Sequence, residues 1–288
     1  DNVYTVSQED IAYHLAHFMD NGYLASDQIM NWPAEGNSGF SKYLAPFIDF
    51  NLDGLYTPKD GDYPAIKGDK AVYCIFNDIN DEHTASFGAG LGIEVQMLAY
   101  TYSESDAIYL EYFIINRRPR IYSDVKIGFF LDGECGLRTD NYAGTLEQYP
   151  QTIFVHNGDD TDEDFFMNDL PFVGVVFLNE NLAQSISFTD GNGKNGKPQV
   201  NTDFIRYSLG MWRDSTPLTY GKSGTETGDK TPYIFAQSSL NNDEIWTETR
   251  EMNNLGARTI LGITDEPILS PRGYIKRNFA IISGTTTS

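Results

Sequence analysis

Apolar residues alternate with polar ones along most of the chain after residue 70. Segments rich in Val, Ile, Phe and Tyr are separated by turn residues between Ala71 and Thr189, a pattern typical of β-strands. In chain order these segments are AVYCIF, GIEVQMLAYTY, AIYLEYFIINR, VKIGFFLD, QTIFVHN, FVGVVFL and QSISFT, and ARTILGIT and YIKRNFAIIS follow as closing strands. Strands at this spacing predict a mainly β fold, an antiparallel β-sandwich with long loops.

The alternation is clearest in the stretch GLGIEVQML. Ile93, Val95 and Met97 point to one side of the predicted strand, whereas Glu94 and Gln96 point to the other. This is the pattern of an antiparallel strand with one face on the core and the other in water. We therefore expect Glu94 and Gln96 to lie on a solvated face.

One segment near the start has helical periodicity instead. Ser7 is placed to cap it, Ile11 and Leu15 share one face, and Asn21 and Gly22 follow as a stop signal. The sequence therefore predicts a short N-terminal helix. The stretch NTDFIRYSLGMW allows a second short helix, capped by Asn201 or Thr202.

A run of aspartate and glycine residues follows the predicted N-terminal helix, with the sequence DFNLDGLYTPKDGDYP from Asp49 to Pro64. Its spacing matches a calcium loop, in which alternate side-chain oxygens, a turn glycine, a carbonyl and a final carboxylate surround Ca²⁺. The corresponding residues are Asp49, Asn51, Asp53, Gly54, the carbonyl of Leu55 and Asp60, with Asp62 as a nearby acidic partner. Pro58 argues against an exiting helix, so the prediction is an isolated loop. The alternative is an acidic turn without metal.

Two further acidic groups follow predicted strands. Asp132, Glu134 and Asp140 in LDGECGLRTDNYAG are weaker metal candidates, because the same residues also suit the end of a solvated loop. The run HNGDDTDEDFF is more typical of a charged surface than of a metal site.

No repeat of fixed period and no long linker divides the chain. The expected organisation is a single large β-rich domain over residues 1–288. Within it, residues 1–70 hold the N-terminal helix and the calcium-loop segment, and residues 71–288 form the sandwich.

The charge balance narrows the range of partners. The 41 acidic and 20 basic residues give a formal net charge of −21, which repels nucleic acids and anionic membrane surfaces and attracts divalent cations. No apolar run approaches the roughly 20 residues of a membrane-spanning helix. Cys74 and Cys135 lack the spacing of a zinc or redox site, and they form either one disulfide or two separate buried thiols.

Glu94 and Glu111 are the best candidates for catalysis, since each interrupts an apolar strand and neighbouring strands can bring them together. Glycoside hydrolysis needs two carboxylates about 5–5.5 Å apart for retention, or about 6.5–9.5 Å for inversion. Exposed aromatic residues would complete a glycan site, and the candidates are Trp32, Trp212 and Trp246. The motifs ExDxxE, GxSxG and HExxH and a glycine-rich phosphate loop are absent, so a non-catalytic role is favoured.

The order of several motifs resembles a large, poorly characterised group of exported proteins of Bacteroidota, which typically carry a C-terminal type IX secretion sorting domain. The motifs are NWPAEG, LAPFIDFNLDGLYTPKDGDYPAIKGD, FNDINDEHT, GIEVQMLAYTY, YFIINR, VKIGFFLDGECG, DNYAG and YSLGMWRDSTPLTYG. The resemblance implies export to the cell surface or medium and a large β-rich module, and it assigns no catalytic residue.

The combined expectation is an extracellular, calcium-stabilised structural or adhesive module without catalytic activity, whose leader has been removed. Its expected partners are other cell-surface or extracellular proteins, further copies of itself, or glycans, and not nucleic acid. The alternative is a carbohydrate-binding or glycan-cleaving protein that uses Glu94 and Glu111.

Overall fold

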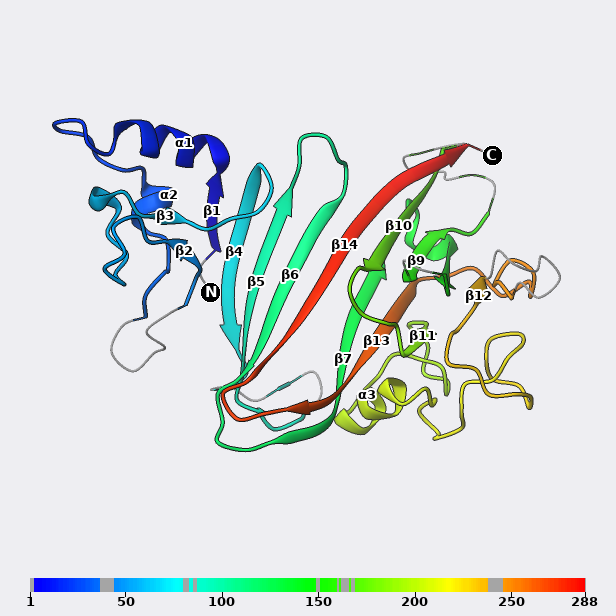
Figure 1. Ribbon diagram of the computed structural model, residues 1–288. Helices are drawn as coiled ribbons and strands as arrows, with labels where there is room; N and C mark the ends of the chain where they lie inside the picture. Colours follow the sequence, from blue (N-terminus) through cyan, green and yellow to red (C-terminus); the bar gives the residue numbers. More distant parts are fainter. Residues whose placement is uncertain are drawn as a thin grey trace.

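The structure, a computed structural model, describes residues 3–36, 44–79, 83–84, 87–148, 151–159, 161, 166, 169–237 and 246–287. The fold is mainly β, as predicted, and is built on a nine-stranded, a three-stranded and a two-stranded sheet. Figure 1 shows the N-terminal helices beside one end of the nine-stranded sheet and the three-stranded sheet beside the other end. Among the described residues, no helix is long and apolar enough to cross a membrane.

The large sheet joins strands from both ends of the chain. Its strands, in spatial order, are β1 (Val3–Ser7), β4 (Lys70–Asn77), β5 (Ile93–Thr101), β6 (Ile108–Asn116), β14 (Tyr274–Thr287), β10 (Asp169–Phe177), β9 (Gln151–Asn157), β8 (Asn141–Leu146) and β12 (Ala236–Gln237). All neighbours pair antiparallel except β8 and β12, which are parallel. The sheet therefore confirms the predicted antiparallel arrangement.

The other elements cover parts of this sheet. The three-stranded sheet has the order β11 (Gln184–Phe188), β13 (Arg258–Leu269) and β7 (Tyr122–Gly133), and the two-stranded sheet pairs β2 (Phe47–Ile48) with β3 (Tyr63–Pro64). The helices are α1 (Gln8–His17), α2 (Asp27–Met30) and α3 (Asn201–Ser208), with 3-10 turns at Pro58–Asp60 and Arg138–Asp140.

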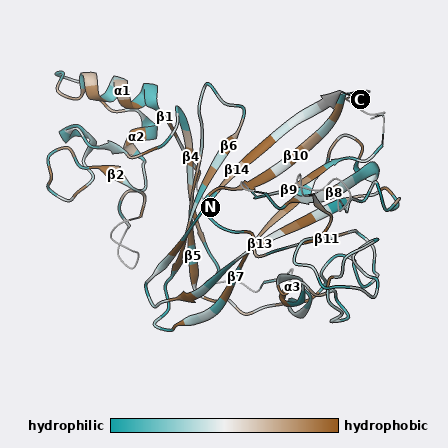
Figure 2. Cartoon of the chain, turned by 45° about the vertical axis from the view of Figure 1, so that its right-hand side comes forward, coloured by the Kyte–Doolittle hydropathy of each residue, from teal (hydrophilic) through white to brown (hydrophobic). Residues whose placement is uncertain are grey.

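The main core lies between the large and the three-stranded sheet. Ile153 and Phe279 of the large sheet and Ile260 of β13 are buried in one cluster, and Figure 2 shows hydrophobic segments along β14, β10 and β13. The other side of the three-stranded sheet packs under α3 and the loops that follow it, where Tyr207 and Trp212 are buried. The three-stranded sheet is thus apolar on both faces, and α3 with these loops forms a third layer of the sandwich.

A second core lies on the opposite face of the large sheet. Val6 of β1, Ile11 of α1, Trp32, Tyr73 of β4 and Leu98 of β5 form this cluster. Successive side chains of a strand point to opposite faces, and the residues next to Leu98 pack against the main core. We call the face under the three-stranded sheet the sandwich face, and the face under α1 the helix face.

This arrangement corrects the expectation for β5. Glu94 and Gln96 do point away from Val95 and Met97, but only 8% of Gln96 and 14% of the Glu94 side chain are exposed. The N-terminal segment covers the face that alternation alone suggested to be solvated. Alternation showed which residues share a face, and it did not show what lies above that face.

Both predicted helices are present. In α1, the Ser7 Oγ accepts a hydrogen bond from the Asp10 amide at 3.1 Å, and the Ser7 amide donates to the Asp10 carboxylate at 2.9 Å, which is a complete capping box. In α3 the cap prediction is wrong, because the N-cap is Val200 and no side chain caps the helix. Asn201 and Thr202 already lie inside its first turn.

Candidate functional site

The acidic loop brings three carboxylates together. Oxygen atoms of Asp49, Asp53 and Asp62 lie within 4.8 Å of one another, and this is the one group of three or more His, Cys, Asp or Glu side chains with that geometry in the described part of the chain. Asp62 is fully buried, whereas Asp53 is exposed. The cluster therefore opens to solvent on one side.

Backbone amides hold this cluster in place. The Asp49 carboxylate accepts from the Gly54 amide at 2.7 Å, and Asp53 accepts from the Leu55 amide at 2.8 Å. These bonds use only part of the acceptor capacity of each carboxylate, which has about four lone-pair sites. Gly54 adopts a φ of 78°, a conformation that favours glycine and turns the chain directly after Asp53.

Asp62 closes the loop from its far end. Its two oxygens accept from the Phe50 amide at 2.8 Å and from the Thr57 amide at 2.7 Å. Asp60, the residue that the twelve-residue register assigned to the last ligand, instead ends the 3-10 turn and is exposed. The structure thus groups the reserve candidate Asp62, rather than Asp60, with Asp49 and Asp53.

Two other predicted ligands lie near this group. The Asn51 side-chain amide donates to the Asp53 carboxylate at 3.0 Å, while its own oxygen accepts from the Asp53 amide at 3.1 Å. Leu55 contributes its amide to the same turn, and its side chain is exposed. Asn51 therefore lies beside the cluster, as the loop pattern requires.

The charge of the cluster has no cationic partner in the described structure. None of the ion pairs among the described residues involves Asp49, Asp53 or Asp62. Burial lowers the pKa of His14, and Asp62 opposes that shift only in part, so His14 is neutral at pH 7. Close carboxylates repel one another, and oxygen ligands of this kind suit a hard cation such as Ca²⁺.

The second acidic group is dispersed. Asp132 accepts a hydrogen bond from the Thr259 hydroxyl at 2.9 Å, and Glu134 pairs with Arg138 at 3.3 Å. Asp140 is buried and accepts from the Asn157 side chain at 3.2 Å. Each of these three residues thus interacts with a different partner. Of the third run, Asp160, Asp162 and Asp164 lie outside the described residues.

The register of β5 and β6 separates the two candidate catalytic carboxylates. Glu94 and Glu111 lie on the same face, but Glu111 is opposite Leu98, four residues after Glu94. At about 3.3 Å per residue, the two backbone positions are roughly 13 Å apart. The two glutamates therefore lie at different levels along the strands and do not face one another as a cross-strand pair.

Each of these glutamates is also held in ion pairs. Glu94 accepts from Arg117 at 2.6 Å, and Glu111 accepts from Lys67 at 2.5 Å and Lys276 at 2.6 Å. Burial raises the pKa of Glu111, but the hydrogen bonds from Lys276 and Lys67 outweigh burial and leave the pKa below its usual value. A general acid needs the opposite shift.

The tryptophans proposed as exposed glycan platforms are all buried, so that expectation is wrong. Trp32, Trp212 and Trp246 belong to the cores, and each indole donates to a backbone carbonyl, that of Pro46, Gly224 or Lys222. Such a bond satisfies the only donor of the indole inside the protein. Glu111 does line a cavity of about 340 Å³ together with Gln96, Tyr73 and Phe113.

The two cysteines are separate thiols. Cys74 and Cys135 are both free, and the Cys135 thiol donates to the Val155 carbonyl at 3.3 Å. Burial raises the pKa of Cys135 to about 11, which keeps it protonated at neutral pH. Neither the disulfide alternative nor a thiolate nucleophile matches this arrangement.

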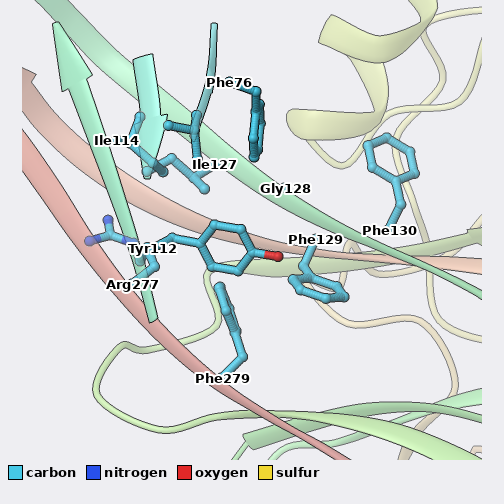
Figure 3. A pocket seen from close by; sticks show the side chains of 10 residues that line it. Phe76, Tyr112, Ile114, Ile127, Gly128, Phe129, Phe130, Arg277 and Phe279 are labelled. Atoms are coloured by element: carbon cyan, nitrogen blue, oxygen red, sulfur yellow. The ribbon is translucent and has the colours of Figure 1, made fainter. Parts of the chain in front are cut away.

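Sequence reasoning missed one prominent feature, an apolar groove at the open side of the sandwich. Two adjoining cavities of about 360 and 510 Å³ lie between β7 and the sandwich face of β4, β5 and β6. Both are lined by Phe76, Val95, Ile114 and Ile127, and Figure 3 shows Tyr112, Phe129 and Phe279 at the inner end of the first. We call this feature the β7 groove. Its residues come from several strands, including β4, β5, β6, β7 and β14, so no local pattern marks it.

Comparison with known proteins gives no further guide to function. No family model matches the chain, and no curated protein matches it.

Proposed function

We propose that this chain is an extracellular, calcium-stabilised structural or adhesive module that does not catalyse a reaction. The observation that carries the proposal is the convergence of Asp49, Asp53 and Asp62, oxygens of which lie within 4.8 Å of one another. In this proposal Ca²⁺ also takes Asn51 and the Leu55 carbonyl from the loop and fixes the loop against α1. The sequence pattern assigns the last ligand to Asp60, whereas the proposed site uses Asp62 in that position.

The calcium would act on the fold rather than on a substrate. The Phe50 ring lies in the same loop and packs edge-on against Phe18, which follows α1, with ring centroids 5.2 Å apart. A cation that orders the loop therefore stabilises the docking of α1 on the helix face of the large sheet. Loops of this kind in extracellular modules bind calcium with dissociation constants of about 10⁻⁴–10⁻³ M, which matches an exported protein better than a cytosolic one.

The arrangement of the two candidate catalytic glutamates also favours a non-catalytic role. Glu94 and Glu111 are each neutralised by basic side chains, and their register holds them apart. The resemblance to exported proteins of Bacteroidota supports display at the cell surface, where partners would be other surface proteins or further copies of the chain.

Calorimetric titration with CaCl₂ tests the calcium part of this proposal. The purified chain is expected to bind Ca²⁺ at one site, while equal concentrations of Mg²⁺ give a much weaker signal, because Mg²⁺ demands a smaller octahedral site. No heat of binding up to about 10 mM calcium, well above the extracellular range, would contradict the proposal.

A second candidate function, carbohydrate binding, is favoured by the cavity beside Glu111. Tyr73 and Phe113 offer rings, and Gln96 and Glu111 offer polar groups, in a space of about 340 Å³. Incubation with a panel of polysaccharides, read by glycan release and by retention on the insoluble polymers, distinguishes the two roles. Cleavage that disappears in Glu94→Gln or Glu111→Gln would replace the structural proposal with the enzymatic one.

A further inference from the structure

The three-stranded sheet is too narrow to cover the large sheet. Its edge strand β7 lies next to the β7 groove, and among the described residues no strand pairs with its outer edge. Beyond that edge, the sandwich face of β4 and β5 still carries Phe76, Val95 and Met97, which are half-buried or exposed. In the part of the chain that the structure describes, an unpaired strand edge and an exposed apolar surface therefore lie side by side.

We infer that the β7 groove accepts an extended strand of another polypeptide, which pairs with the outer edge of β7 and packs on the sandwich face of β4, β5 and β6. The inference rests on the proposed adhesive role, for which it supplies the contact surface. An added strand lies about 4.7–4.9 Å from its neighbour and about 10 Å from a facing sheet, so it falls directly over the uncovered side chains.

The position of apolar residues in the groove defines the sequence that such a strand needs. Val125, Ile127 and Phe129 of β7 point toward the large sheet, because their register partners, such as Gly262 opposite Phe129, belong to the inner side of β13. A strand added beside them also places every second side chain inward. Its inward positions must be apolar, and its outward positions can be polar.

The groove offers little to orient a small molecule. Its one buried charged group is Arg277, whose guanidinium donates to the Thr264 hydroxyl at 2.9 Å and lies 3.4 Å from both Glu180 and Glu266. Small-molecule sites usually combine apolar walls with a few free polar groups. Beside the groove, the edge strand β7 offers main-chain amides and carbonyls of the kind that a second strand recognises.

The net charge of the chain further restricts the sequence of the partner strand. The net charge of −21 disfavours an acidic partner and favours one with basic flanks. The predicted partner is thus an extended segment that alternates apolar and uncharged residues between lysine or arginine residues.

A labelled synthetic peptide in which Val alternates with Thr between terminal lysines tests the inference by fluorescence anisotropy. A matched peptide with Pro in place of alternate Thr residues keeps the apolar side chains and lacks the amide donors. The first peptide is expected to bind the full chain and the second to bind at least about tenfold more weakly, as expected when strand pairing is lost.

Two variants with similar starting exposure localise the binding. Phe76→Glu places a carboxylate in the groove, whereas Leu146→Glu does so on the helix face of β8, and the parent residues are 40% and 39% exposed. Phe76→Glu should weaken binding at least about tenfold, and Leu146→Glu should leave it unchanged. Equal loss in both variants would overturn the inference.

Amide exchange on the parent chain supplies a test that does not depend on the variants. Bound peptide should slow exchange at alternate amides of β7, the strand that gains the partner. Equal binding of both peptides, unchanged exchange in β7, or binding of anilinonaphthalene sulfonate without binding of the peptide would each overturn the inference. Peptide binding is measured both with calcium and with chelator, so that the two proposals can fail separately. If the peptide binds and calcium has no effect on the chain, only the proposed calcium role is contradicted.

Discussion

Asp62 is the residue on which the calcium site depends most directly. It is buried, it accepts two backbone amides, and it groups with Asp49 and Asp53. Asp62→Asn keeps its size and removes its charge, so calcium affinity should fall at least about tenfold. The matched variant Asp60→Asn should change affinity by less than about threefold. Calorimetric titration of both variants measures the difference, and a larger effect at Asp60 would favour the twelve-residue register.

Glu111 makes a pH-dependent contribution to stability. Its folded pKa is lowered, since the bonds from Lys276 and Lys67 outweigh burial. The stabilisation is therefore fully present above the unfolded pKa of about 4.3 and is lost as pH falls through the folded pKa. Glu111→Gln should lower the free energy of unfolding by about 1–2 kcal/mol at pH 7.

Urea unfolding of the parent and of Glu111→Gln across this pH range measures that difference. The two curves should approach each other as the pH falls below about 4. A difference in unfolding free energy that stays constant down to acid pH would assign the effect of the substitution to packing instead.

At the level of elements, α1 offers the best-defined local test. Ser7 completes a capping box with Asp10, whereas Ser26 at the N-cap of α2 makes no capping bond. Ser7→Ala should therefore lower the free energy of unfolding by about 0.5–2 kcal/mol, and Ser26→Ala should have little effect. Guanidinium unfolding of the two variants measures this, and equal losses would contradict the assigned cap.

The elements were largely predictable, because each follows from a local pattern. The capping box of α1 and the alternation of β5 are written in neighbouring residues, and both are present. The burial of Gln96 was not predictable in this way, since it depends on the N-terminal segment that folds over β5. Val200 replaced the predicted caps of α3 because a helix start can also be fixed by its surroundings.

The candidate site was predictable to a similar degree. The loop spacing identified Asp49, Asn51 and Asp53, but the final acidic residue depends on how the chain turns through Pro58–Asp60, and the turn brings in Asp62. The distance between Glu94 and Glu111 required the strand register, and the β7 groove required the packing of two sheets. Long-range contacts of this kind leave no mark in a single sequence.

At the scale of the whole molecule, one sheet carries cores on opposite faces at its two ends. Calcium acts on the end where α1 and the acidic loop lie, through the contact between Phe18 and Phe50. A ligand that binds only the folded chain, at one hundredfold above its dissociation constant, adds about 2.7 kcal/mol to the free energy of unfolding. For a chain of this size, each kcal/mol of added stability raises the melting temperature by roughly 2–4 °C.

Thermal unfolding with calcium and with chelator tests this account most directly. The parent should melt several degrees higher in calcium, whereas Asp53→Ala, which lacks one ligand, should melt at the same temperature under both conditions. Asp132→Ala, in the dispersed acidic group, should retain the full response of the parent. If the parent melts at the same temperature with calcium and with chelator, the loop is an acidic turn that needs no metal, and the calcium-stabilised module is contradicted.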